Sequence, residues 1–166
     1  MSLTIRAITP RDYPRVLEIW RPIYRETTAT FASEEKTETT LPIYIESRRA
    51  AGRETFVAEL DGELLGFASY DQFRGGDGYV HAMEHTIILA PEGRGRGAGR
   101  ALMNAVEDHA RAAGAHVMVA GVSAENTVGV AFHAAVGYVE VGRMPQVGRK
   151  FGRWLDLVLM QRILTP

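Results

Sequence analysis

The stretch APEGRGRGAGRALMNAVEDHARAAG, residues Ala90 to Gly114, determines how the rest of the chain can fold. It opens with alternating glycine and arginine and continues as a helix-forming segment, and the strand-like run His85–Leu89 precedes it. A glycine turn between a strand and a helix lets the backbone approach a ligand, and the first-turn N–H groups favour an anion. The order of elements predicts a phosphate site. A solvated basic loop that caps an ordinary helix is the alternative.

The predicted phosphate contacts are main-chain groups of the turn and the guanidinium groups beside them, which form charge-assisted hydrogen bonds. These residues are Arg94, Gly95, Arg96, Gly97, Ala98, Gly99 and Arg100. In the helix that follows, apolar spacing predicts a buried face made of Leu102, Ala105, Val106, His109 and Ala113.

The common nucleotide-binding motifs fit this turn poorly. No lysine follows the glycines, as the mononucleotide motif G-x-x-x-x-G-K-[ST] requires. Gly93, Gly95 and Ala98 match a dinucleotide fingerprint only loosely, and no carboxylate follows after about 20 residues. A different phosphate-bearing ligand is therefore expected.

Composition predicts one globular domain over residues 1–166, with 46% hydrophobic and 23% charged residues. A net charge of −1 does not suggest nucleic acid as a partner. The absence of cysteine excludes a disulfide framework and a thiol nucleophile. No apolar run is long enough for a membrane span or a signal peptide, so we expect no membrane partner and a cytoplasmic protein.

The remaining pattern predicts a mixed sheet with helices on both faces. Helices are expected from Thr9 or Asp12 until Pro22 ends or bends the first, then over 40–51 and 126–136. Expected strands are 3–8, 55–60, 63–70, 79–89, 116–122, 138–141 and 154–162. Asp61-Gly62 predicts a two-residue hairpin turn, and a polar loop is expected between the last two strands.

Two motifs resemble those of the GNAT superfamily of N-acetyltransferases. Arg94-x-x-Gly97-x-Gly99 is similar to the signature Q/R-x-x-G-x-G/A, which binds the CoA diphosphate, and Asn126 through Tyr138 resembles the later motif N-x₆-Y/H-x₃-G-F/Y. The resemblance implies the GNAT fold of the α/β (α+β) class. That fold is a twisted, mixed and mostly antiparallel sheet of about seven strands flanked by about four helices.

Within the superfamily the chain looks most like the phosphinothricin and methionine sulfoximine (sulfone) N-acetyltransferases. The similar stretches include Thr27–Phe31, Ala68–Tyr70 with Phe73-Arg74, and Lys150–Asp156. The resemblance implies acetyl-CoA as cofactor, the α-amine of a small amino-acid-like substrate as acceptor, and a homodimer. The chain departs from the pattern in its glycine-rich loop after Arg74.

Glu84 is the candidate base. Alternation along its strand places it on one face with apolar neighbours such as Ala82 and Ile88, so lost solvation would raise its pKa. The resemblance also implies a base at this position, acting through water. An exposed or ion-paired acid is the alternative. His85 points to the opposite face, where we expect a structural role.

The resemblance implies that this strand splays from its neighbour near a bulge. Free main-chain N–H groups of Ile87, Ile88 and Leu89 would then bind the thioester and the pantetheine arm. His133 stands where many relatives place the acid that protonates the thiolate, although a packing role is equally consistent with its helix. Asn126 would bond the pantetheine arm, cap that helix, or do both.

For the acceptor, Arg74 is expected to bind a carboxylate, and Thr28, Phe31, Tyr44 and Glu84 to shape the pocket. A surface arginine in a glycine loop is the alternative for Arg74. His81 and His85 would lie about 13 Å apart on a strand, so no metal site is expected. Two alternatives remain open: another amine acceptor (a polyamine, an aminoglycoside or a protein N-terminus), and an acyl-CoA-binding module without turnover.

Overall fold

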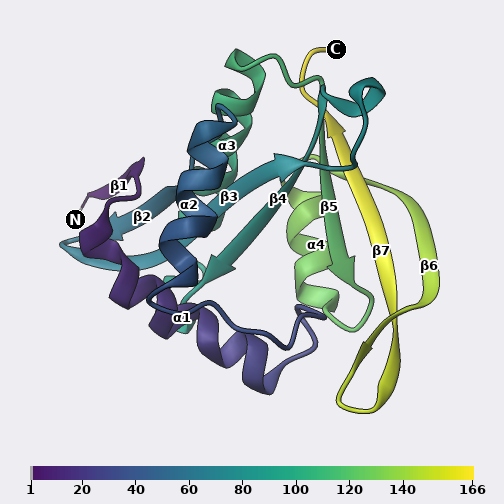
Figure 1. Ribbon diagram of the computed structural model, residues 1–166, viewed down its shortest axis with the longest axis horizontal. Coiled ribbons are helices and arrows are strands. Elements are labelled where there is room, and N and C mark those ends of the chain that lie inside the picture. The colour runs from purple at the N-terminus through teal and green to yellow at the C-terminus, as the bar shows by residue number, and fades with distance from the viewer. Residues whose placement is uncertain (1) are drawn as a thin grey trace.

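The computed structural model describes residues 2–166, which form one seven-stranded sheet with helices on both faces (Figure 1). The strand order is β1-β2-β3-β4-β5-β7-β6. The bounds are β1 Leu3–Ala7, β2 Phe56–Leu60, β3 Glu63–Gln72, β4 Ala82–Leu89, β5 Val117–Ser123, β6 Val139–Lys150 and β7 Arg153–Ile163. Every neighbouring pair is antiparallel except β4 with β5. The predicted fold class is therefore confirmed.

Four helices cover the sheet, in pairs. The bounds are α1 Tyr13–Glu26, α2 Thr40–Ala50, α3 Ala98–Ala112 and α4 Thr127–Ala135. One buried cluster joins α1 and α2 to one face through Trp20, Leu41 and Phe67. A second cluster packs α3 against the other face through Leu102 and Val106, with side chains of α4 against it. The sheet therefore lies between the two clusters, with β4 and β5 near its middle (Figure 1).

Local sequence signals explain most element boundaries. Thr9 forms a capping box at the short 3-10 helix Pro10–Asp12, and Asp12 is the N-cap of α1, so both predicted starts are used. The hairpin at Asp61-Gly62 is confirmed, with both residues at positive φ as a type I′ turn requires. Among residues 2–166, no helix is long and apolar enough to cross a bilayer.

The observed elements differ from three expectations. Of the two effects expected of Pro22, ending α1 does not occur: the helix continues for four more residues because packing of Trp20 and Tyr24 outweighs the lost hydrogen bond. The strand expected over 79–89 begins only at Ala82, after the 3-10 helix Asp77–Tyr79. The expected polar loop is instead a continuation of β6, because long-range pairing with β7 orders residues without an apolar pattern.

The buried face of α3 also differs from the expected one. Leu102 and Val106 are buried as predicted, but Met103, Glu107 and Ala110 complete the face. Ala105 and His109 are only half-buried and Ala113 is exposed. Glu107 is tolerated in the core because Tyr138 donates a hydrogen bond to it at 2.9 Å and Arg162 contacts it at 2.7 Å.

Candidate active site

The sheet opens between β4 and β5. The two strands pair only through Ala82, Met83 and Glu84, whereas β4 stays paired with β3 as far as Leu89. Beyond Glu84, the β5-facing edge of β4 therefore has no strand beside it and keeps main-chain groups available for a ligand. The β3–β4 register is continuous, so this opening, which the resemblance implied, forms without a bulge in that ladder.

A cavity of ≈ 320 Å³ lies at this opening. Its volume is in the range of small-molecule sites. The lining residues come from both faces of the sheet and are Trp20, Tyr24, Ala29, Thr30, Lys36, Tyr44, Arg48, His85, Thr86, Ile87, Ile88, Ala120, Gly121, Val122, Asn126 and His133. The cavity thus connects the α1–α2 side with the α4 side through the gap in the sheet.

Glu84 lies at the start of the gap, over Gly121. A Cβ atom placed on Gly121 would lie 3.0 Å from Oε2 of Glu84, so the carboxylate occupies the space above a residue that lines the cavity. Burial raises the pKa of Glu84 above its ordinary value. Within residues 2–166 no cation lies within salt-bridge distance of it, which leaves the carboxylate free to accept a proton.

His85 and His133 form a buried pair beside the gap. Their Nε2 atoms lie 2.9 Å apart, and Nδ1 of His133 lies 2.7 Å from the carbonyl oxygen of Gly129. Because a carbonyl only accepts, Nδ1 of His133 carries the hydrogen, and the His133 Nε2 lone pair accepts from His85. Nδ1 of His85 is buried and has no hydrogen-bond partner of good geometry in the described chain. The nearby Val119 carbonyl favours the charged form of the ring, but burial outweighs this effect.

The pair is neutral in its resting form. Burial and the neighbouring His133 ring lower the pKa of His85 to about 3, and burial also lowers the pKa of His133. A neutral His133 has no free N–H, because both ring nitrogens are engaged. The predicted acid role of His133 would therefore require a pair that carries one extra proton. His85, expected to be structural, lines the cavity with it.

The glycine-arginine turn has the geometry of an anion site. Gly95 and Gly97 have φ of 71° and 80°, where glycine is favoured, and no side chain caps α3. The first-turn N–H groups therefore point outward unpaired. Arg94 and Arg96 are exposed and form no salt bridge in the described part of the chain, so a diphosphate fits the turn in charge and in donors.

The other predicted cofactor contacts divide into two groups. Ile87 and Ile88 line the cavity, and Asn126 does so while its Oδ1 caps α4 by accepting from the N–H of Gly129 at 2.9 Å. Ala98 and Leu89 do not line the cavity. Ala98 is buried at the start of α3, and the Leu89 side chain packs against the same turn, 3.3 Å from a Cβ placed on Gly99.

Arg100 and the predicted acceptor residues are more dispersed. Arg100 donates to the carbonyl of Ala135 at 3.2 Å. Tyr44 lines the cavity, as expected, but Thr28 donates to Glu125 and Phe31 packs against Gly148 of β6, both outside the lining. The structure does not bring Arg74 to the cavity, because it lies on the exposed loop with its guanidinium 5.3 Å from the Tyr79 ring.

Four lining residues with bulky or charged side chains were not expected from the sequence. Trp20 and Tyr24 stack at 5.5 Å on α1, and Lys36 and Arg48 flank Tyr44. Apolar spacing along the first helix places Trp20 on its buried face, and nothing in that spacing marks Trp20 or Tyr24 as part of a cavity. Nothing local marks Lys36 or Arg48, because folding alone brings the segment before α2 to the gap.

A buried lysine holds the cavity wall. Lys150, at the end of β6, is 3% exposed and donates through Nζ to the carbonyls of Thr27 at 2.7 Å and Thr30 at 2.9 Å. Burial lowers its pKa. These bonds fix the segment after α1, which carries Ala29 and Thr30 into the cavity lining. Elsewhere among residues 2–166, no cluster of three metal-ligating side chains occurs.

Comparisons with known proteins agree with this geometry. The model of the Acetyltransferase (GNAT) family matches residues 13–138. The Escherichia coli L-amino acid N-acyltransferase MnaT is 36% identical, over 96% of this chain and 92% of that protein. The L-methionine sulfoximine/L-methionine sulfone acetyltransferase of Pseudomonas aeruginosa is 37% identical, over 100% and 97% of the respective chains.

A solved structure has the same fold. The phosphinothricin acetyltransferase of Sinorhizobium meliloti, determined in complex with AcCoA, superposes with a TM-score of 0.91 at 30% identity, over 98% of this chain and 89% of that one. The family match covers most of the sequence, and the relatives align over nearly their full length. The resemblance seen in the motifs is thereby confirmed, and the chain belongs to the GNAT family of acetyltransferases.

Proposed function

We propose that this protein transfers the acetyl group of acetyl-CoA to the α-amine of a small amino-acid-like acceptor, of the methionine sulfoximine or phosphinothricin type. The observation that carries the proposal is the gap between β4 and β5, which opens at Glu84 and is continuous with the cavity. The named relatives act on such amino acids and align with nearly the whole chain, which supports this acceptor class.

The turn before α3 would hold the diphosphate. Backbone N–H groups from Gly95 to Gly99 supply donors, and Arg94, Arg96 and Arg100 supply charge. The pantetheine arm would follow the free edge of β4 at Ile87–Leu89, with Asn126 across the gap. Bound acetyl-CoA supplies an acyl group activated as a thioester.

Glu84 would act as the base. An alkylamine is mostly protonated near neutral pH, so its nitrogen needs to lose a proton before it can attack the acyl carbon. Glu84 takes that proton, directly or through one water. Main-chain N–H groups along the free edge of β4 would stabilise the developing negative charge on the acyl oxygen. The new C–N bond forms as the C–S bond breaks, and the departing sulfur takes a proton.

The proton for the departing sulfur has two possible sources at this site. His133 would be one when the His85–His133 pair carries an extra proton, and the attacking nitrogen, which loses a second proton, is the other. Because burial keeps the pair neutral, we expect His133→Gln to affect turnover less than Glu84→Gln does. An equal loss in the two variants would instead assign the acid to His133.

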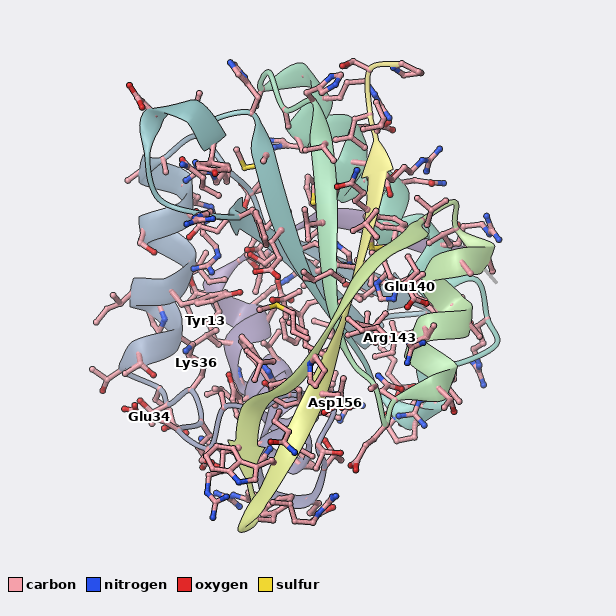
Figure 2. All side chains as sticks on the ribbon, turned by 90° about the vertical axis from the view of Figure 1, so that its right-hand side faces the viewer. Tyr13, Glu34, Lys36, Glu140, Arg143 and Asp156 are labelled. Atoms are coloured by element: carbon pink, nitrogen blue, oxygen red, sulfur yellow. The ribbon has the colours of Figure 1, made fainter. Side chains whose placement is uncertain are left out.

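We further propose a homodimer that uses the β6–β7 hairpin. This hairpin extends from one side of the molecule (Figure 1) and crosses the face that Figure 2 shows. Its exposed apolar side chains include Val139, Val147 and Trp154, at 62%, 49% and 59% exposure, as an interface would provide. Light scattering should give twice the chain mass, and a monomer at micromolar concentration would contradict the proposal.

The working unit would be one domain, residues 1–166, in the cytoplasm. The continuous sheet from β1 to β7 and the absence of cysteine support this. Calorimetry should show a single unfolding transition, and cell fractionation should recover the protein with soluble enzymes.

Thiol release from acetyl-CoA tests the acceptor class. The panel comprises free amino acids, L-methionine sulfoximine, phosphinothricin, a polyamine, an aminoglycoside and a peptide with a free N-terminus. We expect the highest kcat/KM with an amino acid. A preference for the polyamine, aminoglycoside or peptide would move the function to another amine, and tight CoA binding without turnover would indicate a binding module.

A further inference from the structure

Two cations line the acceptor side of the cavity. Lys36 lies in the segment just before α2, close to the first turn of that helix (Figure 2), and Arg48 lies on α2 itself. Both contact the Tyr44 ring, Lys36 with Nζ 5.2 Å and Arg48 with Cζ 3.5 Å from its centroid. The Lys36 Nζ is also 5.8 Å from the Trp20 ring. Aromatic faces therefore hold both charges in the cavity wall.

Among residues 2–166, neither cation has a close carboxylate partner of its own. No carboxylate lies within 4 Å of Lys36 in the described chain, and the nearest to Arg48 is Asp71 at 3.8 Å. Asp71 is already bound by Arg53 at 2.8 Å. The Arg48 side chain is 17% exposed, its Nε is buried without a hydrogen-bond partner, and Nη1 reaches only the Tyr44 carbonyl at 3.3 Å.

Three neighbouring arginines on α1 and α2 differ from Lys36 and Arg48 in having a close carboxylate partner. Each forms a close salt bridge: Arg21 with Glu38 at 2.7 Å, Arg25 with Glu35 at 2.6 Å and Arg49 with Glu54 at 3.0 Å. Lys36 and Arg48, which have no carboxylate partner within 3.5 Å in the described part of the chain, are also the two cations that line the cavity.

We propose that Arg48 and Lys36 bind the carboxylate of the acceptor amino acid and so select α-amino acids over simple amines. The inference rests on the proposed function and names the residues that recognise its substrate class. Arg48 donates from its Nη atoms, and Lys36 adds a second charge from the other segment. With its carboxylate bound there, the acceptor's amine can extend along the cavity toward Gly121, over which Glu84 lies.

The test compares one acceptor with and without its carboxylate. L-methionine sulfone and 3-(methylsulfonyl)propylamine are assayed with wild type, Arg48→Gln, Lys36→Met and the control Arg49→Gln, which alters a paired arginine on the same helix. We expect the amino-acid KM to rise about 10- to 100-fold in Arg48→Gln and about 10-fold in Lys36→Met. The amine's KM, and the acetyl-CoA KM that reports on folding, should change less than about twofold, as in the control.

The outcomes separate this inference from the proposed function. If wild type acetylates no amino acid, the proposed function fails and this inference fails with it. If wild type acetylates methionine sulfone and both variants keep its KM, or raise the KM of the amine equally, the inference is overturned while the function stands. A selective rise for the amino acid supports both.

Discussion

The cofactor half and the acceptor half of the cavity are built differently. Most of the proposed cofactor half is one contiguous stretch, in which β4 leads through the glycine-arginine turn into α3, and Asn126 joins it from across the gap. The proposed acceptor half consists of residues from α1, the segment around Lys36 and α2. Lys150 of β6, much later in the sequence, donates a hydrogen bond to the segment after α1 and holds it in place. A carrier shared by a whole family can be bound by a local motif, whereas acceptor selection depends on tertiary contacts.

The largest effect should come from Glu84, where the two halves meet. Glu84→Gln keeps the shape and removes the base, so kcat should fall about 100- to 10,000-fold while the Kd for CoA, measured by calorimetry, stays within about twofold. Asp108→Asn, on the exposed side of α3, is the matched control. A variant that keeps wild-type turnover would remove Glu84 from the mechanism.

The pH profile of wild type sharpens this prediction. As a base, Glu84 would act only when ionised, and burial raises its pKa. As the pH is lowered, log kcat/KM should therefore begin to fall while the pH is still above the usual carboxylate range. Below that point the rate should drop about tenfold per pH unit. An acid limb that persists unchanged in Glu84→Gln would assign it to another group.

Gly121→Ala should disturb the place where the two halves meet, because Gly121 lines the cavity beneath the Glu84 carboxylate. The new methyl group would lie 3.0 Å from Oε2 of Glu84, so the carboxylate has to move. The required shift is a few tenths of an ångström, smaller than the displacement of about 1 Å that can cost about 100-fold in rate, so we expect kcat to fall about tenfold with unchanged affinity for CoA. Unchanged kcat would mean that the position of the carboxylate is not critical.

Arg94→Ala combined with Arg96→Ala should affect only the cofactor half. Losing two charge-assisted contacts to phosphate should raise the KM for acetyl-CoA about 10- to 100-fold and leave the acceptor KM within about twofold. Arg11→Ala serves as the control, because Arg11 is 70% exposed and lies far from the turn in the sequence. An acceptor KM that rises equally would show that the halves are not separable.

Lys150→Met should give the smallest change and confine it to the acceptor half. The variant leaves the carbonyls of Thr27 and Thr30 without their donor, which should cost about 1–3 kcal/mol of stability. The loosened wall should raise the acceptor KM several-fold and spare the acetyl-CoA KM. Chemical denaturation with steady-state kinetics checks both, and a rise in the acetyl-CoA KM alone would contradict the assignment.

The same contrast explains what the sequence could predict. The turn, its helix, the Asn126 cap and the exposed strand edge follow from local patterns and one family signature, and Glu84 follows from alternation along β4. Lys36 and Arg48 carry no local signal, because their surroundings exist only after α1 and α2 pack together on one face of the sheet. The histidine pair was missed for a related reason. His85 and His133 are 48 positions apart, and their bond depends on how α4 lies against the sheet.

A crystal structure with CoA and L-methionine sulfone bound tests the central claim most directly. We predict the diphosphate against the N–H groups of 95–99, the sulfur in the gap between β4 and β5, and the acceptor amine within hydrogen-bond reach of Glu84, directly or through one water. A diphosphate bound away from the turn, or an amine with no direct or water-mediated path to Glu84, would contradict it.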